Sequence, residues 1–516
     1  MKRTRLSRTD RTALHSPLQE PARAHPLYPA LNALLALVVA NLVLQPLTEP
    51  DFGWHLRTGL DLIRQHGRLP LLDPYSYTMP DWPWVEHAWL TDLLIGLCYS
   101  AGGALAVILF FGCLTAAAWL LAARCGEASA PFRLLACILS LYVALPFLGA
   151  RTQFVTVLGM AVLMWLLARM REGDRHMVWW IPPLFLLWAN LHGGFTAGLF
   201  FLSLVLVLSW LIDLRAPGKD GGNTAVQGPL LWKLGVAIGV GAALTVVNPY
   251  GWRLHQEILD SLSNRFMIDT LQEWHPLALD TLAGKMCLAY TFALALAMVL
   301  WCRRIEPVRV AVLIVFLVLA VRHARNVPLF LIVSVPLAAE LLDTMFGRLS
   351  MRPAVKRIPP HQWAAGLTLM VAIVLLYFGP EHVQRVWRFG VRPEVAFRQT
   401  SYPIEAIEWI QDHRDRLGTR PIHDYQYGGF MLWWLPGVHV FIDGRMPAWR
   451  IGDRHIFLDY MNVREADPPH LDVLDKYGVD WALLKRDSIL ARALSGLPAW
   501  EKEYEDGKVI VFKLKK

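Results

Sequence analysis

Two carboxylates follow the first long apolar run of the chain, in the order Glu49-Pro50-Asp51. A carboxylate at the edge of a membrane is costly unless water or a cation compensates its charge, which makes this pair a candidate functional site. Asp51 could act as a general base that takes a proton from a hydroxyl group, and Glu49 could assist it. The same pair could hold a divalent metal ion, Mg²⁺ or Mn²⁺. The plainer alternative is that both are solvated loop residues that cap a helix.

More polar residues follow in the same segment, residues 48–87. His55 comes soon after Asp51, and Asp73, Glu86 and His87 follow further along. These side chains would join the carboxylate pair if the segment folds back on itself. One reaction that needs both a base and compensation of a leaving phosphate is glycosyl transfer.

A second set of polar residues lies at the ends of later apolar runs: Arg151, His192, Arg322 and Arg325. We expect most of them on the same side of the membrane as residues 48–87. Guanidinium groups match phosphate oxygens in bidentate fashion, so the three arginines are candidates to bind a lipid phosphate. The alternatives are that Arg322 and Arg325 reach toward lipid headgroups and that His192 makes an inter-helix hydrogen bond.

The elements that position these residues are membrane helices. Of 516 residues, 55% are hydrophobic and only 18% are charged, and the mean hydropathy is +0.36. Many apolar runs approach the roughly 20 residues that a helix needs to cross a bilayer. They occupy residues 27–47, 103–123, 134–150, 154–168, 195–212, 231–247, 282–301, 308–321, 327–342 and 363–378. Together with the weaker candidates 88–101 and 179–191, they predict an α-helical polytopic bundle of about 11–13 spans.

The charge distribution predicts how the bundle is oriented. Residues 1–26 form a basic tail, which the positive-inside rule keeps in the cytoplasm, and basic residues before the last span favour an extracytoplasmic C-terminal part. An even count of twelve spans would return the C-terminus to the cytoplasm, so one of the two weak candidates must be interfacial or re-entrant, or a further span is hidden. The net charge of +8 comes mostly from short loops, so we expect no nucleic-acid partner.

The chain divides into three parts. Residues 1–26 are the cytoplasmic tail, residues 27–379 are the transmembrane bundle with its outer loop 48–87, and residues 380–516 are a small extracytoplasmic α/β domain. In this domain we expect helices at 402–413, 429–435 and 471–477, and strands at 421–425, 438–443 and 480–485, followed by a hairpin of 500–504 and 508–513. Asp443-Gly444-Arg445 follows a predicted strand, as a ligand or catalytic carboxylate does, or it forms an ordinary turn.

The whole pattern resembles the GT-C superfamily of polytopic glycosyltransferases that use polyprenyl-phosphate-linked sugars. The strings that carry the resemblance occupy residues 51–55, 73–76, 86–90, 188–194, 248–252, 325–330 and 442–445, and they look most like a bacterial family of GT-C-like membrane proteins. The resemblance implies a catalytic carboxylate in the first outer loop, for which Asp51 is the matching position. It also implies a lipid-phosphate donor, often with a divalent metal. This chain has Glu-x-Asp where the family pattern has two adjacent carboxylates.

The sequence therefore predicts a multi-pass protein of the bacterial inner (plasma) membrane. The expected activity moves a sugar from a polyprenyl-phosphate-linked donor to a glycan, lipid or protein acceptor at the outer face. Three alternatives stay open: an oligosaccharide ligase or polymerase, a lipid or solute transporter, and an inactive assembly scaffold. The absence of an internal repeat and the gathering of charges at one edge favour an enzyme over a transporter.

Overall fold

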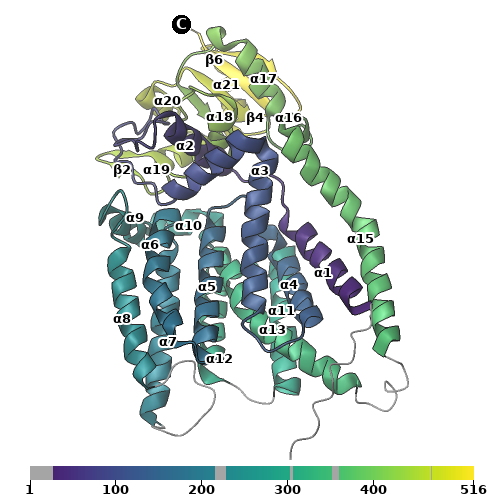
Figure 1. Cartoon of the computed structure of the whole chain (residues 1–516). Coiled ribbons are helices and arrows are strands. Elements are labelled where there is room, and N and C mark those ends of the chain that lie inside the picture. The colour runs from purple at the N-terminus through teal and green to yellow at the C-terminus, as the bar shows by residue number, and fades with distance from the viewer. Residues whose placement is uncertain (1–26, 216–227, 303–305, 351–359, 466–467, 516) are drawn as a thin grey trace, which may run out of the picture.

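A computed structural model describes residues 27–215, 228–302, 306–350, 360–465 and 468–515. It has a helical bundle with a small α/β domain at one end (Figure 1). The predicted tail 1–26 lies outside the described residues. Helix α1 starts beside α15, farther from the α/β domain than its end, and runs toward that domain (Figure 1).

Apolar helices make up the bundle, because a helix satisfies its backbone hydrogen bonds internally in lipid. Among the described residues, seven helices are long and apolar enough to cross a membrane, and two shorter apolar helices pack with them. The seven are α3 (Trp89–Ala123), α4 (Ala130–Ala144), α5 (Gln153–Arg171), α7 (Phe195–Arg215), α11 (Leu282–Trp301), α13 (Val327–Ser350) and α15 (Pro360–Val391), and the two are α1 (Leu27–Val43) and α8 (Pro229–Leu244). Helices α6 (Ile181–Leu191) and α12 (Pro307–Arg322) also pack in the bundle. Seven helices of spanning length are fewer than the 11–13 spans that the sequence predicts.

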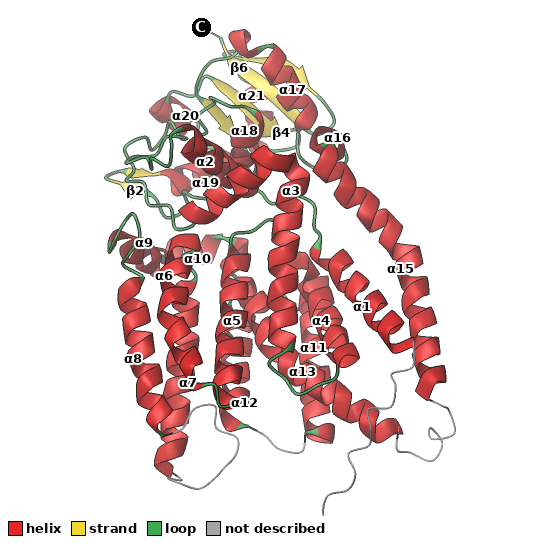
Figure 2. Ribbon diagram, in the orientation of Figure 1, coloured by secondary structure: helices red, strands yellow, loops and turns green. Residues whose placement is uncertain are grey.

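The weak candidate 88–101 is not a separate span but the first part of α3. The helix bends at Gly102 and Gly103, whose backbone angles are not helical, and Gly103 has a φ of 62° that favours glycine. Before this bend α3 lies across the end of the bundle, beneath the α/β domain, and after it α3 runs along the bundle (Figure 2). Residues 88–101 therefore do not form a separate membrane-crossing helix of their own.

The last bundle helix extends further than expected. The sequence places the boundary of the C-terminal domain at residue 379, where the apolar run ends and Gly379-Pro380 follows. In the structure α15 continues through Pro380 to Val391. This polar extension carries the chain from the bundle to the α/β domain (Figure 1), so a Gly-Pro pair in this context does not end the helix.

The C-terminal domain contains a four-stranded sheet in the order β1-β4-β6-β5. Strand β1 pairs with β4 in parallel, and the other pairs are antiparallel. The strands are β1 (Pro421–His423), β4 (Trp481–Lys485), β5 (Trp500–Glu505) and β6 (Val509–Leu514), with a separate pair β2 (Arg450–Ile451) and β3 (Arg454–His455). The helices are α16 (Pro393–Phe397), α17 (Ile404–Asp412), α18 (Gly428–Trp434), α19 (Ile456–Arg464), α20 (Asp472–Tyr477) and α21 (Ile489–Ser495). The predicted terminal hairpin is confirmed.

The predicted strand at 438–443 is wrong. Only Val440 is paired there, and its partner is Ser76 in the outer loop. The amide of Val440 donates to the carbonyl of Tyr75, and the amide of Tyr77 donates to the carbonyl of Val440. The backbone of this segment therefore serves the contact between loop and domain instead of the sheet.

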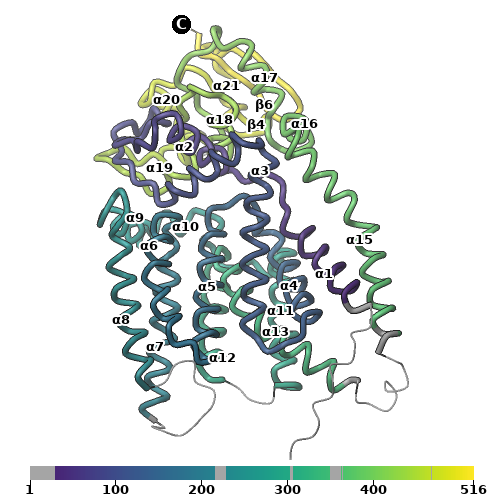
Figure 3. Tube along the Cα trace, viewed as in Figure 1, coloured from purple at the N-terminus to yellow at the C-terminus, as the bar shows by residue number. Residues whose placement is uncertain are grey.

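The outer loop contains one amphipathic helix, α2 (Phe52–Arg64), followed by an irregular segment with one bridge between Leu72 and Pro83. Two further short helices, α9 (Arg253–Ser263) and α10 (Arg265–Thr270), lie at the same end of the bundle (Figure 1). The 3₁₀ helices are η2 (Leu145–Phe147), η3 (Arg175–Trp180), η4 (Gln272–Trp274), η5 (Ala324–Asn326), η6 (Arg414–Arg416) and η7 (Tyr425–Tyr427). The outer loop with α2, from the early part of the chain, therefore lies beside α18 and α19 of the C-terminal domain (Figure 3).

The outer loop and the α/β domain share one hydrophobic core. Phe52, Trp54 and Trp84 from the loop pack in the same buried cluster as Ile407 and Trp481 from the domain. A larger and separate core lies inside the bundle. The domain is therefore built around the loop, and residues of both can form one site.

Glycines bring α2 into backbone contact with its neighbours. A Cβ at Gly59 would lie 1.9 Å from the carbonyl oxygen of Asp92 in α3, and a Cβ at Gly53 would lie 1.9 Å from the carbonyl oxygen of Gly429 in α18. No side chain fits at either position without moving a backbone. Helix α2 is therefore held between α3 on one side and the C-terminal domain on the other.

This packing predicts that Gly59→Ala destabilises the protein. The added methyl group must push α2 away from α3, and overpacking of this kind costs about 1–3 kcal/mol. The matched control is Gly239→Ala in α8, where nothing lies within 4 Å of the added carbon and alanine favours the helix. Thermal unfolding of the purified protein measures both. Equal unfolding temperatures for the two variants would contradict the close contact of α2 with α3.

Candidate active site

Asp51 occupies the position just before α2, but it does not cap the helix. Its backbone is helical, with φ −82° and ψ −17°, and its side chain makes no capping hydrogen bond. The structure therefore rejects the helix-capping alternative for Asp51 and leaves its carboxylate available. Glu49 differs, because its Oε2 lies 2.6 Å from Nε of Arg151 at the start of α5. The loop carboxylates and one of the predicted arginines are thus brought together.

The carboxylate of Asp51 faces the C-terminal domain. A Cβ at residue 444 would lie only 1.8 Å from Oδ1 of Asp51, so glycine is the residue that lets the turn 443–445 come so close. Asp51 is accessible to solvent, yet protein surrounds it closely. This desolvation, reinforced by the negative charge of Glu273, raises its pKa to about 6. A base with a pKa near neutrality is suited to accept a proton at physiological pH.

Arg325 reaches the same region, and it is held there by two neighbours. Its guanidinium lies 3.5 Å from the carboxylate of Glu273 and 4.2 Å from the centre of the Trp274 ring. Glu273 was not among the predicted site residues, although the sequence shows a charged residue in a loop at this end of the bundle. Arg322 ends α12 at the same end but is exposed, and among the described residues no ion pair joins it to the cluster. The prediction that Arg322 binds substrate therefore receives no contact that supports it.

The two predicted histidines lie next to each other, with ring centres 5.4 Å apart for His87 and His192. Nδ1 of His192 lies 2.8 Å from the hydroxyl of Thr156 in α5, which is the inter-helix hydrogen bond that we considered as the alternative. Desolvation, together with the positive charges of neighbouring histidine and arginine, lowers the pKa of His87 to about 3. Both rings are therefore neutral and serve as hydrogen-bonding groups at neutral pH.

A buried group lies behind Asp51. Nδ1 of His55 is 2.6 Å from Oδ1 of Asp92, and Glu86 completes a set whose ligand atoms all lie within 4.8 Å of one another. Among the residues that the structure describes, these three form the only group of three or more histidine, cysteine, aspartate or glutamate side chains that could hold a metal ion. Glu49 and Asp51 belong to no such set. Sequence inspection missed Asp92 because it lies inside an apolar run.

Desolvation also dominates the titration of the loop members of this group. It raises the pKa of Glu86 to about 8, with the charge of Asp92 adding to the effect, and it lowers the pKa of His55 to about 4. At neutral pH Glu86 is therefore mostly protonated and His55 is neutral while only protein surrounds them.

Arg445 joins the outer loop to the C-terminal domain. Its guanidinium contacts Asp73 at 2.6 Å and Asp443 at 2.5 Å, and all three side chains are buried. Aromatic rings of Tyr75, Trp84, Trp54 and Trp449 surround it, with centres between 5.1 and 5.9 Å away. Asp73 also accepts a hydrogen bond from the hydroxyl of Ser76. Asp73 and Asp443 are thus engaged within the protein, and Asp73 lies in this loop–domain contact instead of beside Asp51.

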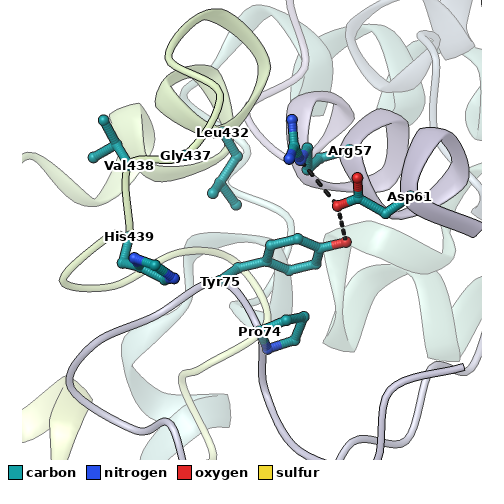
Figure 4. Close-up of a pocket in the computed structure, with 8 residues that line it drawn as sticks. All are labelled: Arg57, Asp61, Pro74, Tyr75, Leu432, Gly437, Val438 and His439. Atoms are coloured by element: carbon teal, nitrogen blue, oxygen red, sulfur yellow. Dashed lines mark hydrogen bonds and ion pairs between the residues drawn. The ribbon is translucent and has the colours of Figure 1, made fainter. Parts of the chain in front are cut away.

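A small cavity opens elsewhere between the loop and the domain (Figure 4). It is lined on the loop side by Arg57, Asp61 and Tyr75, which are linked because Asp61 accepts hydrogen bonds from both of the others. None of the predicted site residues lines it. The cavity is therefore distinct from the cluster around Asp51.

Comparison with known proteins found solved structures that have a similar fold. No family model and no curated protein matches this sequence. The structure is similar to the archaeal oligosaccharyltransferase AglB from Archaeoglobus fulgidus in complex with an inhibitory peptide and a dolichol-phosphate, with a TM-score of 0.53 and 14% identity over 89% of this chain and 69% of that one. It is also similar to ArnT from Cupriavidus metallidurans in the apo state, with a TM-score of 0.51 and 16% identity over 94% and 97%. These likenesses show the fold, so the predicted GT-C-like architecture of a helical bundle with a small C-terminal α/β domain is confirmed.

The buried arginine yields a stability prediction. Arg445→Met leaves two buried carboxylates without their cationic partner and should cost about 3–5 kcal/mol, detected as a lower unfolding temperature and faster proteolysis of the C-terminal domain. The control is Arg398→Met, which removes a solvent-exposed pair with Glu408 and should cost about 0–1 kcal/mol. If the two variants unfold alike, Arg445 does not hold the domain on the loop.

Proposed function

We propose that the protein is an inverting glycosyltransferase that moves a sugar from a polyprenyl-phosphate-linked donor to a hydroxyl acceptor. The observation that carries this proposal is the uncapped carboxylate of Asp51, which lies in one cluster with the pairs Glu49–Arg151 and Glu273–Arg325. A base and cations that face a phosphate are the two requirements of this reaction. The GT-C-like fold supports the assignment.

In the proposed reaction Asp51 takes the proton of the acceptor hydroxyl. The acceptor oxygen forms a bond to the anomeric carbon of the sugar while the bond from that carbon to the phosphate oxygen breaks. The lipid phosphate leaves with the electron pair, and its negative charge is stabilised by guanidinium groups. The carboxylate of Asp51 ends protonated and returns its proton to water.

Arg325 is our first candidate to face the phosphate, and Arg151 and Arg322 are further candidates. Arg325 lies in the cluster, and its Nη1 is 3.5 Å from Oε1 of Glu273, which makes a weak ion pair. The guanidinium therefore keeps hydrogen-bonding capacity for a ligand. His55, Glu86, His87 and His192 lie around the same region and would shape the donor site. The AglB structure contains a dolichol-phosphate, which supports a lipid phosphate as the donor group.

We place the reaction at the outer face of the bacterial inner membrane. Helix α1 runs toward the C-terminal domain, and α2, which Asp51 directly precedes, lies against that domain (Figure 1). With the basic tail in the cytoplasm, the cluster is extracytoplasmic. The membrane supplies the donor tail, and a glycan, lipid or protein supplies the acceptor.

One alternative enzyme has support from an observation. AglB is an oligosaccharyltransferase, so a chain of this fold could transfer a preassembled glycan in place of a single sugar. Donors that carry one sugar or an oligosaccharide, offered to the purified protein in separate assays, distinguish the two activities. Uptake of a lipid or solute without any transfer would favour a transporter.

Asp51→Asn should abolish transfer, because the amide cannot accept the proton, while the variant still inserts into the membrane and elutes normally in gel filtration. Wild-type activity should fall as the pH drops through about 6, since protonation of Asp51 removes the base, and should be full above it. Asp81→Asn, which alters an exposed carboxylate of the same loop, is the control and should keep its activity. Full transfer by Asp51→Asn would refute the mechanism.

The KM for the donor distinguishes the proposed roles of Arg325 and Arg322. Arg325→Gln should raise the KM for the donor about tenfold or more, because a hydrogen bond to a charged group contributes about 1.5–3 kcal/mol. Arg322→Gln should change it less, since Arg322 is exposed and outside the cluster. The double variant Glu273→Gln, Arg325→Gln tests whether an unpaired Glu273 causes the loss. Recovery of the donor KM in that variant would remove Arg325 from the phosphate site.

A further inference from the structure

The group His55, Glu86 and Asp92 has features that the proposed transfer reaction does not use. His55 comes from the first turn of α2, Glu86 from the end of the outer loop, and Asp92 from the first turn of α3. All three side chains are buried, with exposed fractions of 5%, 3% and 0%. Two carboxylates and an imidazole are therefore enclosed at the point where loop, interfacial helix and domain meet.

The surrounding cations do not balance these carboxylates. The charge of Arg445 acts on the group, but Arg445 is already paired with Asp73 and Asp443. Arg151 is paired with Glu49, and Arg325 is paired with Glu273. Within the described part of the chain, the buried carboxyl groups of Glu86 and Asp92 therefore have no arginine as an ion-pair partner. Two buried carboxyl groups without an arginine call for protons or a further cation.

A second observation points to a ligand. Oδ1 of Asp92 contacts His55, but Oδ2 is buried and no hydrogen-bond partner reaches it within the described ranges. An unpaired carboxylate oxygen in a fully buried residue is costly, because it has lost its water without gaining a donor. A metal ion bound to this oxygen would remove that cost.

We propose that His55, Glu86 and Asp92 form a binding site for a divalent transition-metal ion, Zn²⁺ or Mn²⁺. The ligand atoms lie within 4.8 Å of one another. Opposite ligands of an ion with bonds of about 2.1 Å lie about 4.2 Å apart, so small side-chain rotations close the set. An imidazole nitrogen among the ligands favours a transition metal over Mg²⁺ or Ca²⁺, which prefer oxygen.

The site differs from a metal on Glu49 and Asp51, and it goes beyond the transfer reaction. The ion would join α2 to α3 through His55 and Asp92. His55 lies one helical turn after Asp51, and its amide donates to the carbonyl of Asp51 at 3.3 Å. Metal binding would therefore hold the start of α2, and with it the candidate base, in place. His55, Glu86 and Asp92 act here as positioning residues.

The test measures metal in the full-length protein, purified in detergent without added metal, by inductively coupled plasma mass spectrometry. We expect about one equivalent of Zn or Mn per chain, and at least a tenfold loss of metal in His55→Gln, Glu86→Gln and Asp92→Asn. Glu49→Gln and Asp51→Asn are matched controls, because they remove nearby carboxylates outside the group, and both should retain the metal.

A second measurement covers variants that fold poorly. The wild-type protein is treated with a chelator and reloaded with Zn²⁺ or Mn²⁺, and its unfolding temperature should fall and then recover. Glu86→Gln relieves carboxylate repulsion, so it should unfold no earlier than the chelated wild type and should not respond to metal. A purely structural role for Glu86 predicts the same response to metal in both proteins.

Three outcomes overturn the proposal: no bound transition metal in the wild type, binding of Mg²⁺ or Ca²⁺ alone, and loss of metal only in the Glu49 and Asp51 variants. The last result would move the metal to the loop carboxylates. Metal content requires no donor or acceptor, so it is independent of the transfer assay. Asp51→Asn with full metal and no transfer supports both proposals, whereas full transfer with full metal refutes the transfer mechanism alone.

Discussion

The buried guanidinium of Arg445 is the contact on which the arrangement of the site depends. It bridges Asp73 in the outer loop and Asp443 in the C-terminal domain, which are brought together from opposite ends of the chain. Charges enclosed in this way are stable only when each has its partner, because the desolvation cost of any one of them alone is several kcal/mol. The loop and the domain therefore hold one relative position, and the turn that carries Arg445 also places Gly444 against Asp51.

Close backbone approach is the second constraint. Gly53 and Gly59 let α2 touch α18 and α3, and Gly429 lies against the carbonyl of Pro50. These contacts fix the direction in which the chain leaves the bundle at Glu49 and enters α2 at Asp51. The result is a helix start whose carboxylate is not used for capping. A candidate base that is rigidly held and not used for helix capping suits proton transfer, since little reorganisation accompanies the reaction.

The pairing of charges explains why such a polar cluster is tolerated at the end of an apolar bundle. Arginines at the starts and ends of helices meet carboxylates from loops, so each ion pair joins two elements: Glu49–Arg151 joins the outer loop to α5, and Glu273–Arg325 joins the two later loops. Asp51 remains outside these pairs, and desolvation moves its pKa toward neutrality. The same physical cause that makes the cluster expensive thus gives the candidate base a useful pKa.

Features encoded by neighbouring residues could be predicted from the sequence. The apolar runs predicted the bundle, and the two segments 500–504 and 508–513 predicted the terminal hairpin, because both features depend on local periodicity. The sequence also indicated that Asp51, Glu49, Arg151 and Arg325 form a group. Helix ends that face the same side of a membrane lie at a similar depth, so polar residues at those ends lie at the same level. It did not assign Glu273 to the site, and it did not reveal Asp92, which lies inside an apolar run.

Only the tertiary structure decided which of these polar residues meet. Asp73 and Arg445 are 372 residues apart, and nothing near either residue specifies the other. The strand expected around Val440 is lost for the same reason, since its backbone pairs with Ser76 of the outer loop. Local sequence determines helices and turns because their hydrogen bonds connect near neighbours. Ion pairs, glycine contacts and buried ligand sets depend on how distant segments pack, and that packing is a property of the whole chain.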